Sequence, residues 1–266
     1  MQRTFAKEKQ TSEIQNTTML TNNTTTVRGT AAAARTMESQ LYENALILNN
    51  CGATLLRGGA LAQAIETFRD AVGAMDFYSQ LLLDPASVER SVIERSMTKV
   101  EVALYRLSNL VRNTAEQGPS PVESMSFEET LLAQTLWIVP VMRFDAYQVV
   151  FSIDTDMALQ RDPEIDAAIL IYNFGVAHLV AHNNQDAHSM FQLSLSIAYN
   201  AEGYDVQVRM ESVVSLMIAG LQNLTHSSLM EGRIGDAEVY HEKIGEIIMT
   251  LLVVEDFLGG SAAAAA

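Results

Sequence analysis

The chain has 266 residues, of which 48% are apolar, and its formal net charge is −15 at pH 7. This length and apolar content allow a sizeable folded core, while a strongly acidic protein repels phosphate backbones and anionic lipid. We therefore expect neither nucleic acid nor a membrane surface as a partner, and favour a basic or neutral protein segment over an acidic one.

Residues 1–40 are expected to form a disordered tail. From Thr11 to Thr30 the chain is mostly Thr, Asn and Ser, with too few apolar side chains to offset the entropy of ordering. The tail could simply be solvated, or it could be regulatory. The start of the chain lacks the apolar stretch of a secretory signal, no continuous apolar run reaches the roughly 18 residues of a membrane span, and Cys51 is the single cysteine. These features predict an intracellular protein, cytoplasmic or nuclear.

Apolar side chains recur at helical spacing through most of residues 41–258, which predicts a mainly α-helical domain. Gly58-Gly59 interrupts the first helical stretch and predicts the turn of a helical hairpin. The Asp84-Pro85 pair is typical of a helix start, so we expect a long amphipathic helix after it. In chain order, the expected elements are a hairpin over 43–77, a long helix over 85–112, a β insertion over 134–154, hairpins over 163–200 and 206–257, and a Gly/Ser/Ala tail over 259–266.

The segment 134–154 departs from the helical pattern. Its two halves, 136–142 and 146–153, are rich in β-branched and aromatic residues, and Arg143-Phe144-Asp145 lies between them. This composition predicts a short β-hairpin or two edge strands. Because Pro140 has no N–H to donate to a neighbouring strand, its strand is expected at an edge or at a bulge.

One arrangement of asparagine, small and aromatic residues occurs three times, once in each expected hairpin. Small residues in both helices of a pair let the two backbones approach each other, and glycine at the turn allows the chain to reverse tightly. The three copies consist of Leu48, Asn50, Cys51, Gly52, Gly59, Ala64 and Phe68; of Ile171, Asn173, Phe174, Gly175, His182, Ala187 and Phe191; and of Leu221, Asn223, Leu224, Thr225, Gly232, Ala237 and His241.

This arrangement resembles the tetratricopeptide repeat, in which pairs of antiparallel helices stack side by side. The resemblance covers three hairpins, under half of the chain. The copies do not follow one another at the roughly 34-residue period of tandem repeats, because the long helix and the β insertion separate the first two. The resemblance implies a mainly α fold of antiparallel hairpins, stacked as a tetratricopeptide-like solenoid or bundle, with a small β-hairpin insertion near 134–154.

In tetratricopeptide domains the first helix of each pair lines a concave face that binds extended peptides or partner helices. The resemblance therefore implies a protein-binding adaptor. An asparagine on this face can hold a ligand's backbone with its amide donor and acceptor. The alternatives are that each asparagine bonds nearby backbone groups and that the tyrosine is a core residue. The candidate binding residues are Asn50, Asn173, Asn223, Asn49, Tyr172 and Gln222.

A subset of the family grips acidic chaperone tails through Lys and Arg on the same face. None of the matching positions in this sequence is cationic, which disfavours an acidic partner of that kind. These positions are Leu46, Asn49 and Ala53, then Ile169, Tyr172 and Val176, then Ala219, Gln222 and His226.

The best argument for an enzyme is a set of histidines in the second hairpin. His178 and His182 lie four residues apart, with Asp186 and His188 nearby, a spacing that could hold a metal ion. The segment between the first two lacks the glutamate of zinc proteases, and structural roles are the alternative. The sequence also lacks a glycine-rich phosphate loop, a serine elbow and paired cysteines.

We therefore predict an adaptor, without enzyme activity, metal or cofactor, that binds another protein through this face or associates with itself. The competing hypotheses are a metal-dependent enzyme and a structural subunit of a larger complex.

Overall fold

The computed structural model describes residues 37–84, 89–113, 124–126, 150–153, 162–201 and 206–263. Within these ranges the protein is mainly helical. Residues 1–36 of the expected disordered tail lie outside the described residues, whereas residues 37–40 are helical. The elements are a helix over 37–57, α2 (Leu61–Leu83), α3 (Arg90–Asn113), β1 (Ser124–Ser126), β2 (Val150–Ser152), α5 (Pro163–Val180), α6 (Asn184–Asn200), α7 (Val206–Met230) and α8 (Ile234–Ala263).

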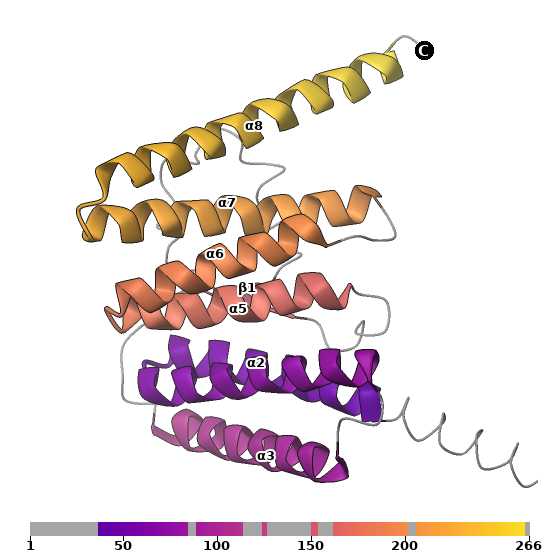
Figure 1. Ribbon diagram of the computed structural model, residues 1–266, viewed down its shortest axis with the longest axis vertical. Helices are drawn as coiled ribbons and strands as arrows, with labels where there is room; N and C mark the ends of the chain where they lie inside the picture. Colours follow the sequence, from indigo (N-terminus) through magenta and orange to yellow (C-terminus); the bar gives the residue numbers. More distant parts are fainter. Residues whose placement is uncertain are drawn as a thin grey trace, which may run out of the picture.

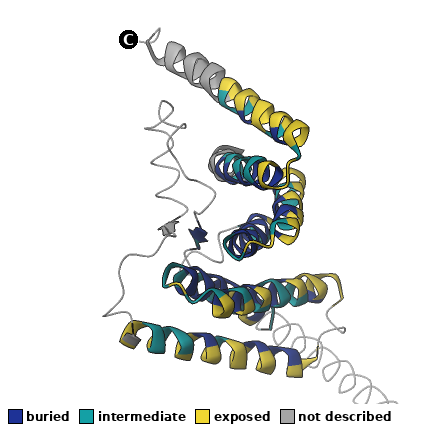
Figure 2. Cartoon of the chain, turned by 90° about the vertical axis from the view of Figure 1, so that its left-hand side faces the viewer, coloured by how far each residue is buried: buried dark blue, intermediate teal, exposed yellow. Residues whose placement is uncertain are grey.

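The helices form a stack that follows the order of the chain, except that α2 and not α3 packs on α5. α3 lies on α2, α2 on α5, α5 on α6, α6 on α7 and α7 on α8, so that α3 and α8 are the two ends of the stack (Figure 1). The stack is bent into an arc, and β2 lies on its inner side next to α5 (Figure 2). The strand therefore lies against α5, the first helix of the second pair.

Three of the connections between helices have the same backbone structure. In each, the second residue after the helix end has a positive φ, 76° at Gly59, 58° at His182 and 74° at Gly232. In each, the following N–H donates to the carbonyl five residues before it, at 2.8–2.9 Å. This is the helix-ending arrangement that normally favours glycine, because a side chain is strained at positive φ. The three hairpins therefore share one turn, although His182 stands where the other two have glycine.

Close contacts between the two helices of a pair also recur. A Cβ added to Gly52 would lie 2.8 Å from the ring of Phe68, and one added to Gly175 would lie 2.8 Å from the ring of Phe191. Each glycine thus lets an aromatic ring of the returning helix pack directly on the backbone of the first helix. Both rings are fully buried.

A buried polar contact connects the first hairpin to the second. The hydroxyl of Tyr42, in the helix over 37–57, donates to a carboxylate oxygen of Asp166 in the first turn of α5. Asp166 is completely buried, and Asp162 caps the same helix by accepting from the N–H of Glu164 at 2.9 Å. Pro163 occupies the first helical position, where an N–H has no helical partner. The start of α5 is therefore determined by the neighbouring residues Asp162 and Pro163.

Several boundaries differ from those expected from the sequence. α2 continues to Leu83, so Asp84 is the residue that ends α2, and α3 begins at Arg90 instead of at the Asp84-Pro85 pair. α8 continues to Ala263, past the glycines at which we expected a tail to begin. The alanines that follow those glycines have the highest helix propensity of all residues, which is consistent with this extension.

The expected β-hairpin over 134–154 falls largely on residues 134–149, which lie outside the described residues. Its last part is the strand β2. The partner of β2 in the described part of the chain is β1, which runs parallel to it with Met125 opposite Phe151. A parallel pair cannot be the two arms of a hairpin, because adjacent hairpin strands are antiparallel.

Candidate functional site

Two of the recurring asparagines hold the extended backbone of β2 and of the residue after it. Asn173 of α5 accepts from the N–H of Phe151 at 2.8 Å and donates to the carbonyl of the same residue at 2.7 Å. Asn50 accepts from the N–H of Ile153 at 2.8 Å and donates to its carbonyl at 2.6 Å. Each amide side chain therefore pairs with both backbone groups of one residue, as a neighbouring strand would.

Asn49 joins these two contacts into one network. Its amide nitrogen donates to the carbonyl of Phe151 at 3.2 Å and to the side-chain oxygen of Asn50 at 3.3 Å, while its own oxygen accepts from Asn173 at 2.8 Å. Asn49 and Asn173 are completely buried, whereas Asn50 is half-buried. The network spans the first two hairpins and fixes which amide atom is donor and which is acceptor.

The geometry of a β-strand explains why Phe151 and Ile153 are the residues held. The N–H and C=O groups of alternate residues point to the same edge of an extended chain, so residues two apart present their backbone groups together. Asn173 and Asn50 occupy the same position in successive hairpins and bond residues two apart. Along the other edge of the strand, β1 pairs with residues 150–152.

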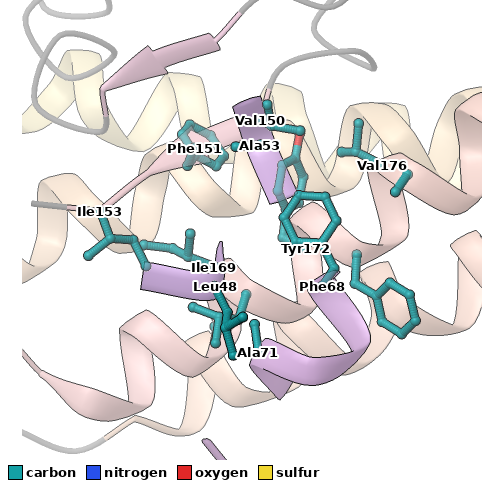
Figure 3. Packing of buried hydrophobic residues seen from close by; sticks show 14 of the residues in the cluster. Leu48, Ala53, Phe68, Ala71, Val150, Phe151, Ile153, Ile169, Tyr172 and Val176 are labelled. Carbon is teal, nitrogen blue, oxygen red and sulfur yellow. The ribbon is translucent and has the colours of Figure 1, made fainter. Parts of the chain in front are cut away.

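Apolar side chains complete the contact between the strand and the helices. The ring of Phe151 lies 5.1 Å from the ring of Tyr172, which in turn lies 5.5 Å from the ring of Phe191 on α6. Figure 3 shows Phe151 and Ile153 among buried side chains of the helices, including Ile169 and Tyr172 of α5. Tyr172 is completely buried, and burial raises its pKa well above the usual value. It is both a core residue and part of the surface that the strand covers.

The third asparagine of the pattern does not contact the strand. Asn223 of α7 is completely buried and donates to the hydroxyl of Tyr172 at 2.8 Å. Its side-chain oxygen has no hydrogen-bond partner within the part of the chain that the structure describes. Gln222 is half-buried beside it on the same helix. The structure thus brings Asn49, Asn50 and Asn173 together on one segment, while Asn223 supports that site through Tyr172.

The alternative in which Asn50 and Asn173 bond nearby backbone groups does not describe this geometry, because their partners lie 103 and 22 residues away in the chain. The segment that they hold could not be recognised from the sequence. The run of β-branched and aromatic residues ending at Ile153 predicted extended backbone, but it did not indicate which residues would bind that backbone.

The histidines considered for a metal site lie in different surroundings. His178 lies 3.6 Å from the carboxylate of Asp186, and His182 is exposed at the turn after α5. His188 of α6 lies 3.1 Å from the hydroxyl of Ser227 and accepts from Arg233 at 3.0 Å. In the ranges described, no three His, Cys, Asp or Glu side chains lie close enough together to hold a metal ion.

Burial is the largest cause of the pKa shifts of two of these histidines. It lowers the pKa of His178, and the nearby carboxylate of Asp186 only partly opposes the shift. For His188 burial and the guanidinium of Arg233 both lower the pKa. Both side chains are therefore held preferentially in the neutral form at neutral pH.

In comparisons with known proteins, no family model matches the chain, and no curated protein or solved structure is significantly similar to it. Of the helices in the described residues, none is long and apolar enough to cross a membrane.

Proposed function

We propose that this protein is a protein-binding adaptor whose inner face holds an extended polypeptide segment through Asn50 and Asn173. The observation that carries the proposal is the pairing of each amide with both the N–H and the C=O of one residue, at 2.6–2.8 Å. Contacts of this kind recognise the backbone, which every peptide has, so side-chain pockets would supply the specificity.

We also propose that the three hairpins form a divergent tetratricopeptide-like arrangement. The first two hairpins are separated in the chain by α3 and the strands. The three matching turns and the two glycine-on-ring contacts support this proposal. They recur at the sequence positions that carry the resemblance. In this arrangement the helix over 37–57, α5 and α7 are the first helices of their pairs, and they supply the asparagines.

The inner face favours a partner segment without acidic side chains. The positions that line it in the first two hairpins are apolar or amide side chains, and burial there would make an unpaired charge costly. The protein as a whole carries a net charge of −15, which favours a basic or neutral partner. The lining positions are Leu46, Asn49, Ala53, Ile169, Tyr172 and Val176.

The expected affinity is modest. Each hydrogen bond contributes about 1 kcal/mol net, and one well-buried aromatic or aliphatic side chain contributes about 2 kcal/mol. Ordering the peptide and losing its free motion offsets part of that gain. A short segment should therefore bind in the micromolar range, as suits an adaptor whose partners exchange.

A peptide library offers a direct test. Random nonapeptides displayed on phage are selected on the full-length double variant Phe151→Ala/Ile153→Ala, whose own strand competes less for the site, and the best binders are then measured by fluorescence anisotropy against this protein with and without Asn50→Ala. Asn200→Ala is the matched control, because Asn200 is exposed at the end of α6 and bonds only within its own helix. We expect at least a tenfold loss of affinity for Asn50→Ala and none for the control. Equal binding to all three proteins, or no selected peptide at all, would count against the proposal.

A further inference from the structure

We infer that the segment Val150–Ile153 is an internal ligand of the inner face, and that a partner binds by displacing it with an extended segment of the same chemistry. That segment would carry an aromatic residue at the place of Phe151, a β-branched residue at the place of Ile153, and no charge between them. This inference rests on the proposed function, because it requires that the inner face binds extended backbone.

The contacts of the strand with the helices are those of a bound peptide. Five hydrogen bonds join the backbone groups of Phe151 and Ile153 to the helices, and every one of them uses an asparagine side chain. A segment of another protein in the same position would form the same five bonds. Exchange would therefore leave none of these asparagine amides unsatisfied, which removes one energetic obstacle to displacement.

The helices of the stack also pack directly on one another. α5 packs directly on α2 and α6, and α7 packs directly on α6 and α8. Gly52 and Gly175 bring the paired helices together without any contribution from residues 150–153. Removal of the strand would uncover the inner face while these helix interfaces remain.

The strand also shows what chemistry the site accepts. Phe151 is completely buried and lies on the ring of Tyr172, and Ile153 is only 2% exposed, so both places require apolar side chains. Both residues donate their N–H groups to asparagine oxygens, so proline is excluded at either place. Ser152 between them is half-buried, and its place tolerates a small polar residue.

The test uses a fluorescent peptide with the sequence of residues 147–155, extended by two lysines for solubility. Its affinity is measured for the full-length wild type and for the full-length double variant Phe151→Ala/Ile153→Ala, whose helicity is checked by circular dichroism. The weakened internal strand should let the variant bind the peptide at least tenfold more tightly than the wild type. A second peptide, N-methylated at the places of Phe151 and Ile153, lacks the two donated N–H groups and should bind at least tenfold more weakly.

Equal affinity of the wild type and the double variant would overturn the inference, and so would equal affinity of the methylated peptide. If library-selected peptides bind in an Asn50-dependent way but the 147–155 peptide does not, the proposed function stands and this inference fails.

If the double variant does not fold, displacement can still be tested on the wild type. Amide exchange of the protein's own Phe151 and Ile153 should accelerate when the peptide is added in excess. Unchanged exchange at both amides while the peptide is bound would refute displacement.

Discussion

Replacement of Asn173 by alanine tests the energetic weight of the asparagine network. The side chain makes three hydrogen bonds at 2.7–2.8 Å, two to Phe151 and one to Asn49, and it is completely buried. Each bond lost in a buried site costs about 1–1.5 kcal/mol, so Asn173→Ala should destabilise the protein by about 3–4.5 kcal/mol. The loss of unfolding free energy cannot exceed the free energy with which the strand docks on the helices. A larger loss would make the undocked strand the more stable state.

Urea unfolding of the full-length protein, followed by circular dichroism, measures this free energy. Asn50→Ala should cost less, about 1–2 kcal/mol, because Asn50 is half-buried and water can replace part of its bonding. Asn200→Ala, on the exposed end of α6, should stay within about 0.5 kcal/mol of the wild type. A change below about 1 kcal/mol for Asn173→Ala would refute the reasoning, since the network and the docking of the strand would then contribute little to stability.

Three further predictions concern the hairpins. His182→Gly should stabilise the protein by about 1 kcal/mol in the same urea assay, because φ is 58° at this exposed position; a loss of stability would contradict the shared turn. Gly175→Ala should destabilise by about 1–3 kcal/mol, because its Cβ would lie 2.8 Å from a buried ring, whereas Gly73→Ala, with open space around it, should be neutral or slightly stabilising; equal effects would refute the contact. The pKa values of His178 and His188 are lowered from 6.5 in the folded state, so the unfolded chain binds more protons below that pH and the thermal midpoint should fall as pH drops from about 7 to about 5. A smaller fall is expected for His178→Gln, and a midpoint that rises on acidification would contradict the assignment.

The local features of the hairpins could be predicted from the sequence because they depend on neighbouring residues. Glycine at positive φ and proline after a capping aspartate act within a few residues, so Gly58-Gly59 and Asp162-Pro163 identify a turn and a helix start correctly. Asp84-Pro85 misled for the same reason. Proline disfavours helical backbone at the residue before it, so Asp84 ends α2 with extended backbone, and the apolar pattern of α2 reaches past the expected end of the hairpin, to Leu83.

The contacts between distant segments could not be predicted in this way. The carboxylate of Asp166 is buried against Tyr42, 124 residues earlier, and no local pattern distinguishes it from an ordinary acidic residue in a first helical turn. The same limit applies to the site. The sequence identified Asn50 and Asn173 as positions able to hold backbone, but the identity of the segment they hold depends on the fold.

Scalar coupling across hydrogen bonds, measured by nuclear magnetic resonance, tests the central claim most directly. On the full-length, isotopically labelled protein, we expect coupling between the amide nitrogen of Phe151 and the side-chain carbonyl carbon of Asn173, and likewise between Ile153 and Asn50. Detection of both pairs would show that asparagine side chains hold an extended backbone in solution. Absence of both couplings, together with fast solvent exchange of the two amides, would contradict the account.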